Sequence, residues 1–265
     1  MRSTGECWFE AERRGFLLWI RESVKHNDSR CGPAMDNPTT REFNAKAVAY
    51  EANRLAPWYL AQSDYVLEHL SLAPTDSVLD IGCGTGYLLR QVARACPGVT
   101  GIGIDIAPRM IQVARAKAAA EALSNLTFVH SDWERLTDQA RTVIGRESVS
   151  WAVCTSVFHY FSAPGSATRA IHGVLRPGGT LLILERARER SLLTLLWQYL
   201  HLFLLRDNVR FYSSAEIVRI VEEAGFRDVR VVSRLRRILW KNKLYTSLAL
   251  VRGTKYSQCE QTDAK

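Results

Sequence analysis

Short apolar runs alternate with helical segments through the middle of the chain. Five runs rich in β-branched and aliphatic residues follow Pro74, and the segments between several of them have the 3.6-residue period of an amphipathic helix. Nearly all-apolar strands that alternate with helices predict a parallel sheet covered on both faces, which is an α/β fold. The predicted strands are residues 77–81, 99–104, 126–130, 150–154 and 180–184, and the predicted helices are residues 87–95, 109–123 and 166–175.

The C-terminal third continues this alternation with one more helix and ends in two strands. Residues 214–224 predict a helix, and residues 228–233 and 244–251 predict two strands joined by a basic loop. Because a short connection favours antiparallel pairing, these two strands are expected to form a hairpin at the edge of the sheet. The predicted fold class is therefore a doubly wound, mostly parallel, seven-stranded Rossmann-like sheet with an antiparallel C-terminal hairpin.

The same pattern indicates one domain, over residues 41–255. Residues 1–40 predict an extension with one short amphipathic segment, and residues 256–265 predict a tail. Residues 41–72 predict a helical N-terminal lid that is interrupted at Pro57, and residues 186–212 predict an insertion on the side where a substrate would bind.

The insertion contains an apolar helix with one narrow polar stripe. Within residues 191–205, Ser191, Thr194, Gln198 and His201 fall on one side at a helical period, and arginines flank both ends. An apolar face of this width needs a partner. The candidates are a hydrophobic or aromatic acceptor, a second copy of the chain in a homodimer, an anionic membrane surface, and ordinary packing over the sheet.

Composition places the chain among globular proteins and locates its positive charge. A hydrophobic share of 47% and a charged share of 23% exclude a disordered or collagen-like chain. Of the formal net charge of +8, residues 186–255 carry 15 Lys and Arg against 6 Asp and Glu, so the rest of the chain is close to neutral. A partner attracted by basic charge is therefore expected at the C-terminal third alone.

The cysteines and the N-terminus favour a cytoplasmic protein without a metal site. Six widely separated cysteines include no Cys-x-x-Cys pair, which counts against a metal site or a disulfide framework and fits a reducing compartment. No signal-peptide pattern opens the chain. The longest charge-free apolar run, residues 191–205, is too short to span a bilayer.

The strongest chemical signal is a glycine-rich turn between the first strand and the helix after it. Asp80 lies at the end of the strand, and Gly82, Gly84 and Gly86 follow at alternate positions. Glycine lets the backbone turn tightly and lets a ligand approach closely, and the start of the helix offers unpaired N–H groups. A dinucleotide fingerprint would need glycine at the position of Tyr87, so the loop departs from that pattern.

Acidic residues after the next two strands point to a nucleoside. Asp105 ends the second strand, where a carboxylate can accept two hydrogen bonds from a ribose diol. Asp132 and Trp133 follow the third strand, and are expected to meet the amino group and the ring of an adenine. Ligands of open parallel sheets bind beyond the carboxyl ends of the strands, so these side chains should share one site.

This order of motifs resembles class I S-adenosylmethionine-dependent methyltransferases of the small-molecule type, the methyltransferase type 11 or ubiquinone–menaquinone methylase-like group, over about residues 45–252. The resemblance implies S-adenosyl-L-methionine as cofactor. It also implies a lid tyrosine, for which Tyr59 is preferred and Tyr50 is the alternative, although Leu60 replaces the acid that usually follows it. The implied cofactor residues are Tyr59, Asp80, Gly82, Cys83, Gly84, Gly86, Asp105, Ile106, Met110, Asp132, Trp133 and Ser156.

Methyl transfer needs the methyl donor and the acceptor atom to be aligned and water to be excluded. It needs a general base only when the acceptor must lose a tightly held proton. His159, which follows the fourth strand, is the first candidate for a base or a substrate-orienting group, and packing beside the cofactor is its alternative role. Tyr160 and His201 are further catalytic candidates. The expected acceptor is a small hydrophobic or aromatic molecule, methylated at oxygen, nitrogen or carbon.

Two other functions remain open at this point. The basic C-terminal third would suit an RNA-modifying methyltransferase, but residues 154–157 are Cys-Thr-Ser-Val rather than the Asn/Asp-Pro-Pro-aromatic pattern of nucleobase amino methylation. No Pro-Cys pair is present to attack a pyrimidine, so a nucleic acid is not the expected partner. The other alternative is a catalytically silent subunit that keeps the cofactor fold and binds a partner protein.

Overall fold

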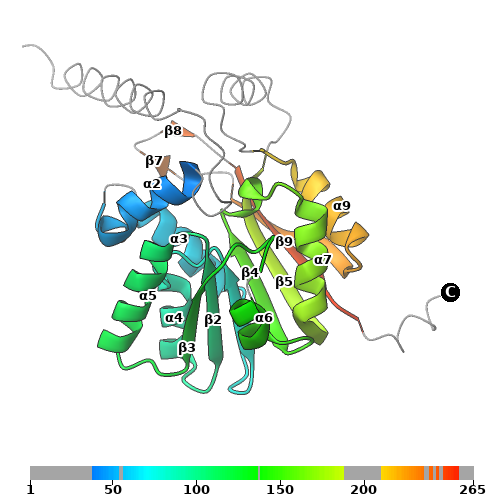
Figure 1. Cartoon of the computed structure of the whole chain (residues 1–265). Helices are drawn as coiled ribbons and strands as arrows, with labels where there is room; N and C mark the ends of the chain where they lie inside the picture. Colours follow the sequence, from blue (N-terminus) through cyan, green and yellow to red (C-terminus); the bar gives the residue numbers. More distant parts are fainter. Residues whose placement is uncertain are drawn as a thin grey trace, which may run out of the picture.

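A seven-stranded sheet with helices on both faces forms the body of the protein (Figure 1). The structure, a computed structural model, describes residues 38–53, 56–136, 138–187, 210–235, 239–240, 243–244 and 247–256. The strands of the main sheet are β1 (Ser77–Ile81), β2 (Thr100–Asp105), β3 (Leu126–His130), β4 (Val149–Thr155), β5 (Leu175–Ala187), β6 (Arg227–Leu235) and β9 (Ser247–Thr254). A separate two-stranded ladder pairs β7 (Leu239–Trp240) with β8 (Lys243–Leu244).

The strand order is β3-β2-β1-β4-β5-β9-β6, and β9 runs antiparallel to both of its neighbours while the other pairs are parallel. This order confirms the predicted doubly wound, mostly parallel sheet with an antiparallel C-terminal pair. The helices are α2 (Pro38–Lys46), η1 (Ala47–Ala49), α3 (Ala56–Leu67), α4 (Tyr87–Ala95), α5 (Pro108–Ala120), α6 (Asp138–Ile144), η2 (Phe158–Tyr160), α7 (Pro164–Val174) and α9 (Ser214–Glu223).

Both faces of the sheet are buried, which explains why its strands are almost entirely apolar. Helices α3, α4 and α5 pack on one face, against side chains such as Val78 and Leu182. Helices α6, α7 and α9 pack on the other face, against side chains such as Leu79 and Ile183. Neighbouring residues of a strand point to opposite faces, so Val78 packs in one helical layer and Leu79 in the other.

Most predicted boundaries agree with the structure to within three residues, and the differences have local causes. Strand β5 begins at Leu175, so the predicted loop at 175–179 belongs to the ladder, with an irregular register opposite Val149 and Trp151. Helix α6 was not predicted. Pro57 lies in the first turn of α3 rather than at a break within a helix, because the first turn does not need its N–H.

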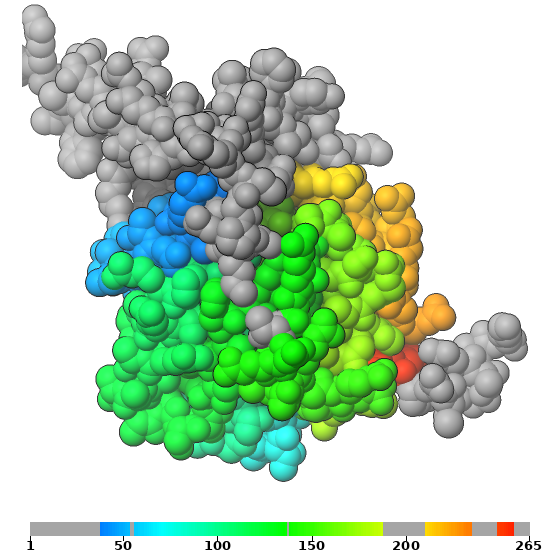
Figure 2. All heavy atoms as spheres, viewed as in Figure 1, coloured from blue at the N-terminus to red at the C-terminus, as the bar shows by residue number. Residues whose placement is uncertain are grey.

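The N-terminal helices meet the sheet at the carboxyl ends of β1 and β2. The Oδ1 atom of Asn44 in α2 accepts a hydrogen bond from the backbone N–H of Arg109 (3.0 Å), at the start of α5. Ala47, Ala107 and Met110 form a small buried cluster between η1 and α5. Figure 2 shows these N-terminal residues, in blue, seated directly on the α5 region. Helix α2 and η1 therefore lie over the end of the sheet where the candidate site was expected, and residues 38–67, the helices of the predicted lid, are called the lid below.

Several predictions fall on residues outside the described ranges. They concern the extension at 1–37, the apolar helix at 191–205 with His201, and the tail from 257 onward. Within the described ranges, no helix has the length and apolar character needed to cross a membrane. Across the same residues, no group of three His, Cys, Asp or Glu side chains is arranged to hold a metal ion.

Candidate active site

The glycine loop is closely packed at Gly82 and Gly86 and is open at Gly84. Gly82, Gly84 and Gly86 have φ angles of +74°, +53° and +75°, a left-handed conformation that favours glycine. A Cβ atom on Gly82 would lie 2.3 Å from Val157, and one on Gly86 would lie 2.6 Å from the ring of Phe128. Among the described residues, a Cβ on Gly84 would meet Tyr50 alone, at 3.9 Å. Gly84 is therefore the glycine of the loop with open space beside it, beneath Tyr50.

The carboxylate of Asp105 connects the end of β2 to this loop. Its Oδ2 atom accepts a hydrogen bond from the backbone N–H of Gly84 (2.9 Å), and its Oδ1 atom accepts one from that of Ala107 (2.8 Å). Burial raises the pKa of Asp105, and the two backbone N–H groups and His130 only partly oppose this. Asp105 is thus held in one orientation beside the loop, with further lone pairs left for a ligand.

Asp80 is a second acid at the same end of the sheet, and it is 4% exposed. Burial and the nearby Asp105 raise the pKa of Asp80 to about 7. No ion pair to Asp80 is found among the described residues. Two buried carboxyl groups with raised pKa values, side by side, favour a ligand that brings positive charge.

We expect Asp80→Asn to stabilise the ligand-free chain in a pH-dependent way. The pKa in the folded state lies above the ordinary value of 3.8, so stability is lost as the pH rises from about 4 to about 7. Asparagine removes this penalty, which amounts to as much as about 4 kcal/mol above pH 7. Denaturant unfolding at pH 5 and pH 8 measures it, and a gain that is equal at both pH values would contradict the assignment.

The lid places Tyr50 directly over the glycine loop. The rings of Tyr50 and Tyr59 are stacked, with centroids 5.0 Å apart and planes 17° apart, and Tyr50 is the nearer to Gly84. Burial raises the pKa of the Tyr50 hydroxyl, and Tyr59 and Asp105 raise it further. The sequence signal for Tyr50 is the acid that follows it, Glu51, since Leu60 follows Tyr59.

The residues predicted near the adenine have separate surroundings. Met110 is buried beneath the lid, and the carbonyl of Ile106 lies 3.1 Å from the Nε2 atom of His130. Asp132 stays partly exposed and accepts a hydrogen bond from the N–H of Glu134 (2.9 Å). The indole of Trp133, in contrast, is 5% exposed and donates to the carbonyl of Ala167 in α7 (3.2 Å), so its ring lies in the core.

Cys83 is also a core residue. Its side chain is 8% exposed, and a Cβ on Gly103 of β2 would lie 2.8 Å from its sulfur. Burial raises the pKa of the Cys83 thiol well above its ordinary value. The contribution of Cys83 to the loop is therefore its backbone and its packing, since an uncharged, buried thiol is unreactive.

The segment after β4 lies between the lid and the glycine loop. Ser156 has a φ angle of +54°, and its hydroxyl donates to the Oε1 atom of Gln62 in α3 (2.5 Å). Gln62 is itself 2% exposed and donates to the carbonyl of Trp58 (3.2 Å). Val157, the next residue, contacts Gly82. One short segment therefore connects the lid helix, the loop and the residues at 158–160.

His159 is buried in this segment and is held by a carboxylate that the sequence did not reveal. The Nδ1 atom of His159 lies 2.9 Å from each oxygen of Glu185, which is 0% exposed at the end of β5. Burial alone would raise the pKa of Glu185, but His159 and the backbone N–H of Arg186 lower it overall. Because Glu185 accepts a hydrogen bond from Nδ1–H, the tautomer that fits this contact carries its lone pair on Nε2.

The sequence contained one sign of Glu185: an acid directly follows the apolar run at 181–184. A charged residue at the end of a fully buried strand needs a partner. The sequence could not identify His159 as that partner, because the two residues come together only through the pairing of β4 with β5.

A row of aromatic rings extends from the lid to His159. The ring of His159 lies 4.1 Å from that of Tyr160 and is nearly parallel to that of Phe211, at 6.5 Å. Tyr160 meets Phe43 of the lid edge-on, with centroids 6.0 Å apart. His159 and Tyr160 are therefore brought together with the lid, while His201 lies outside the described residues.

The fold and this arrangement are typical of Rossmann-like proteins that bind a nucleoside-containing cofactor. In such proteins, acids at the ends of neighbouring strands, here β1 and β2, flank a glycine loop. Residues 72–249 match a methyltransferase domain family, and the chain belongs to that family. The prediction of a class I S-adenosylmethionine-dependent methyltransferase is thereby confirmed.

Individual proteins agree with this assignment at low identity. The chain is 28% identical to a malonyl-[acyl-carrier protein] O-methyltransferase of Paenibacillus over 156 residues, 56% of this chain and 55% of that protein. It is 26% identical to a demethylmenaquinone methyltransferase of Tropheryma whipplei over 232 residues, 80% of this chain and 89% of that protein. The chain thus spans about half the length of the first relative and most of the second.

Solved structures share the fold. A complex between the Haloferax volcanii Trm112 methyltransferase activator and a methyltransferase has a TM-score of 0.64 at 21% identity, covering 82% of this chain and 98% of that one. Phosphoethanolamine N-methyltransferase 2 of Haemonchus contortus, solved with S-adenosyl-L-methionine, has a TM-score of 0.65 at 16% identity, covering 84% of this chain and 61% of that one.

The residues present fit S-adenosylmethionine on chemical grounds. The buried acids Asp80 and Asp105 form no ion pair with Lys or Arg in the described part of the chain, and the cofactor carries an ammonium and a sulfonium group. The lone pairs of Asp105 suit the ribose diol, and Gly84 leaves the loop open for close approach.

Proposed function

We propose that the protein methylates a hydroxyl group of a small aromatic or hydrophobic molecule, with His159 as general base. The observation that supports this most directly is the buried His159–Glu185 pair beside the glycine loop. A histidine whose Nδ1 atom is held by a carboxylate presents Nε2 as a proton acceptor, which a hydroxyl acceptor requires and a free amine or carboxylate does not.

The residues have distinct tasks in this reaction. S-Adenosylmethionine would supply an electrophilic methyl group, and S-adenosylhomocysteine would leave as the carbon–sulfur bond breaks. Nε2 of His159 would take the proton of the acceptor hydroxyl as its oxygen is methylated, and Glu185 would stabilise the imidazolium that results. The lid excludes water, which otherwise competes for the site. Tyr160, adjacent to His159, is a second group within reach of the acceptor.

The row of rings formed by Phe43, Tyr160 and Phe211 supports an aromatic acceptor, because such rings stack on flat apolar molecules. We place the reaction in the cytoplasm, which suits the unpaired thiols of Cys83 and Cys154. The predicted apolar helix at 191–205 lies outside the described residues, and its role in binding a hydrophobic acceptor stays a prediction.

The test is a transfer screen with S-adenosylmethionine labelled at the methyl group. Purified protein is incubated with phenols, alcohols, amines and RNA, and the products are identified by mass spectrometry. We expect label on the oxygen of phenolic compounds. Label on RNA alone would support the RNA-modifying alternative, and label on amines alone would contradict the need for a base.

A further inference from the structure

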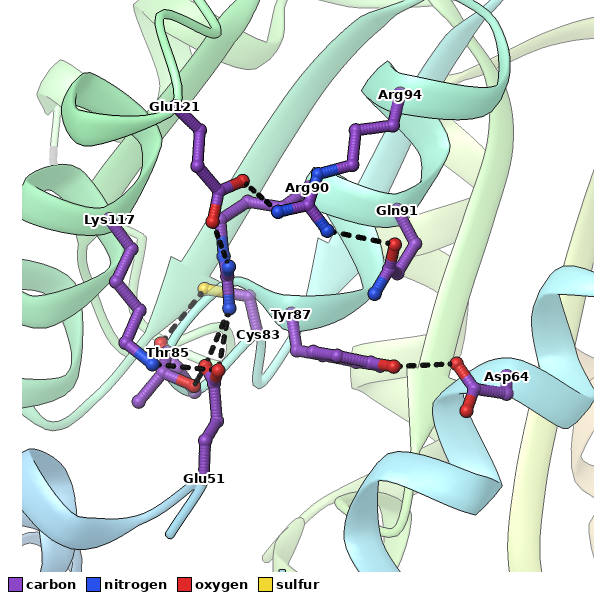
Figure 3. Close-up of polar contacts among 11 residues, drawn as sticks. Glu51, Asp64, Cys83, Thr85, Tyr87, Arg90, Gln91, Arg94, Lys117 and Glu121 are labelled. Atoms are coloured by element: carbon purple, nitrogen blue, oxygen red, sulfur yellow. Dashed lines mark hydrogen bonds and ion pairs between the residues drawn. The ribbon is translucent and has the colours of Figure 1, made fainter.

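A cluster of charged side chains surrounds Glu51, the residue that follows Tyr50 (Figure 3). The Nη2 atom of Arg90 donates to both oxygens of Glu51, at 2.7 and 2.8 Å. The Nζ atom of Lys117 lies 2.7 Å from Glu51, and the hydroxyl of Thr85 donates to it at 2.5 Å. One lid carboxylate therefore contacts α4, α5 and the glycine loop at the same time.

The electrostatics of this cluster make its contacts strong. The side chain of Arg90 is 5% exposed, and its other terminal nitrogen, Nη1, donates to Glu121 at 2.5 Å. Burial would raise the pKa of Glu51, but the hydrogen bonds from Lys117, Thr85 and Arg90 lower it overall, so Glu51 stays ionised. A guanidinium buried to this extent requires its carboxylate partners, and charge-assisted hydrogen bonds between them are about twice as strong as neutral ones.

Two neighbouring lid residues thus bind two neighbouring residues of the loop. The ring of Tyr50 lies over Gly84, and the carboxylate of Glu51 binds the hydroxyl of Thr85. The backbone N–H of Tyr50 also bonds to the carbonyl of Ala47, at 3.4 Å. Because the peptide bond between Tyr50 and Glu51 is rigid, a fixed Glu51 restricts the positions that the Tyr50 ring can take.

We propose that Glu51 is a positioning residue for Tyr50: by binding Arg90, Lys117 and Thr85 together, it holds the Tyr50 ring over Gly84 and so slows release of the cofactor. This inference rests on the proposed function in one respect, that the cofactor lies between Gly84 and Tyr50. Opening of the lid over the loop then requires these three contacts to break.

The test compares Glu51→Gln with the matched variant Glu121→Gln. Both replacements remove one negative charge from the same buried arginine, but Glu121 follows α5 and, among the described residues, forms its ion pairs with Arg90 and Arg94 rather than with the lid. The dissociation rate of S-adenosylhomocysteine, followed by stopped-flow tryptophan fluorescence, should rise about tenfold or more in Glu51→Gln and less than about twofold in Glu121→Gln. Equal rates in the two variants would overturn the proposal, because they would reflect only the loss of charge at Arg90.

A double-mutant cycle with Tyr50→Ala tests whether Glu51 acts through the tyrosine. In the Tyr50→Ala background, Glu51→Gln should change the dissociation rate by less than about twofold. If Glu51→Gln has its full effect in that background, Glu51 acts by another route and the proposal is wrong.

Amide hydrogen exchange of residues 47–53 in the ligand-free chain measures the positioning without any cofactor. Exchange should be about tenfold faster in Glu51→Gln than in the wild type, and unchanged in Glu121→Gln. Unchanged exchange in Glu51→Gln would overturn the proposal. Failure of the wild-type chain to bind S-adenosylhomocysteine would instead count against the proposed function, so the two failures can be told apart.

Discussion

Replacement of Asp105 by alanine should weaken binding of S-adenosylhomocysteine about 100-fold or more. The carboxylate orients the glycine loop through the N–H group of Gly84, and it is the best-placed acceptor for a ribose diol. Loss of two charge-assisted hydrogen bonds to a ligand costs about 3 kcal/mol or more, which corresponds to that factor. Isothermal titration calorimetry measures the change directly.

Asp76→Ala is the matched control. Asp76 is 5% exposed, and it accepts hydrogen bonds from the N–H of Ala73 (2.9 Å) and from Arg176 (2.8 Å) at the amino end of β1, away from the site. Its loss should lower stability and leave ligand affinity within about threefold. If Asp105→Ala binds the ligand as well as the control does, the ribose assignment is wrong.

His159→Ala should lower turnover about 100-fold to 10,000-fold and leave the affinity for the cofactor within about threefold. The reason is that the proposed role of the histidine is to receive the acceptor proton, and no contact between His159 and the glycine loop is found among the described residues. Steady-state rates with a phenolic acceptor measure the first effect, and calorimetric titration with S-adenosylhomocysteine measures the second.

Glu185→Gln separates the role of the carboxylate from that of the histidine. The amide oxygen can still accept a hydrogen bond from Nδ1–H, but the NH2 group must face the backbone N–H of either His159 or Arg186, which bond to different oxygens of Glu185. We expect turnover to fall at least about tenfold. His172→Ala in α7 is the control, since His172 packs on Phe226 away from the site and its loss should leave turnover unchanged. For the histidine itself, a turnover in His159→Ala equal to that of the wild type would show that His159 is not the general base.

The strands and the glycine loop were predictable because their signals are local. An apolar run such as residues 77–81 specifies a buried strand, and three alternate glycines specify the turn after it. The order of the sheet was predictable in outline, because parallel strands joined by helices leave few topologies. The position of Asp105 followed from the rule that ligands meet the carboxyl ends of strands.

The contacts that the sequence could not predict join distant segments. Glu185 reaches His159 across 26 positions, and Glu51 reaches Arg90 across 39. No local pattern encodes such pairs, although each acid stands beside a recognisable element. For Trp133, whose place after β3 predicted a contact with the adenine, the structure adds a position in the core beside Ala167 that no local pattern indicated, and the adenine contact stays a prediction.

The insertion of β9 between β5 and β6 has a consequence for how the chain is made. In the described part of the chain, β6 pairs with β9 and with no other strand, so residues 227–235 have no sheet to join until residues 247–254 have been synthesised. Until then β5 also has a free edge, and free edges pair readily with other chains. Completion of the sheet is therefore a late event on the ribosome, and truncation before residue 247 should produce protein that aggregates as it leaves the exit tunnel.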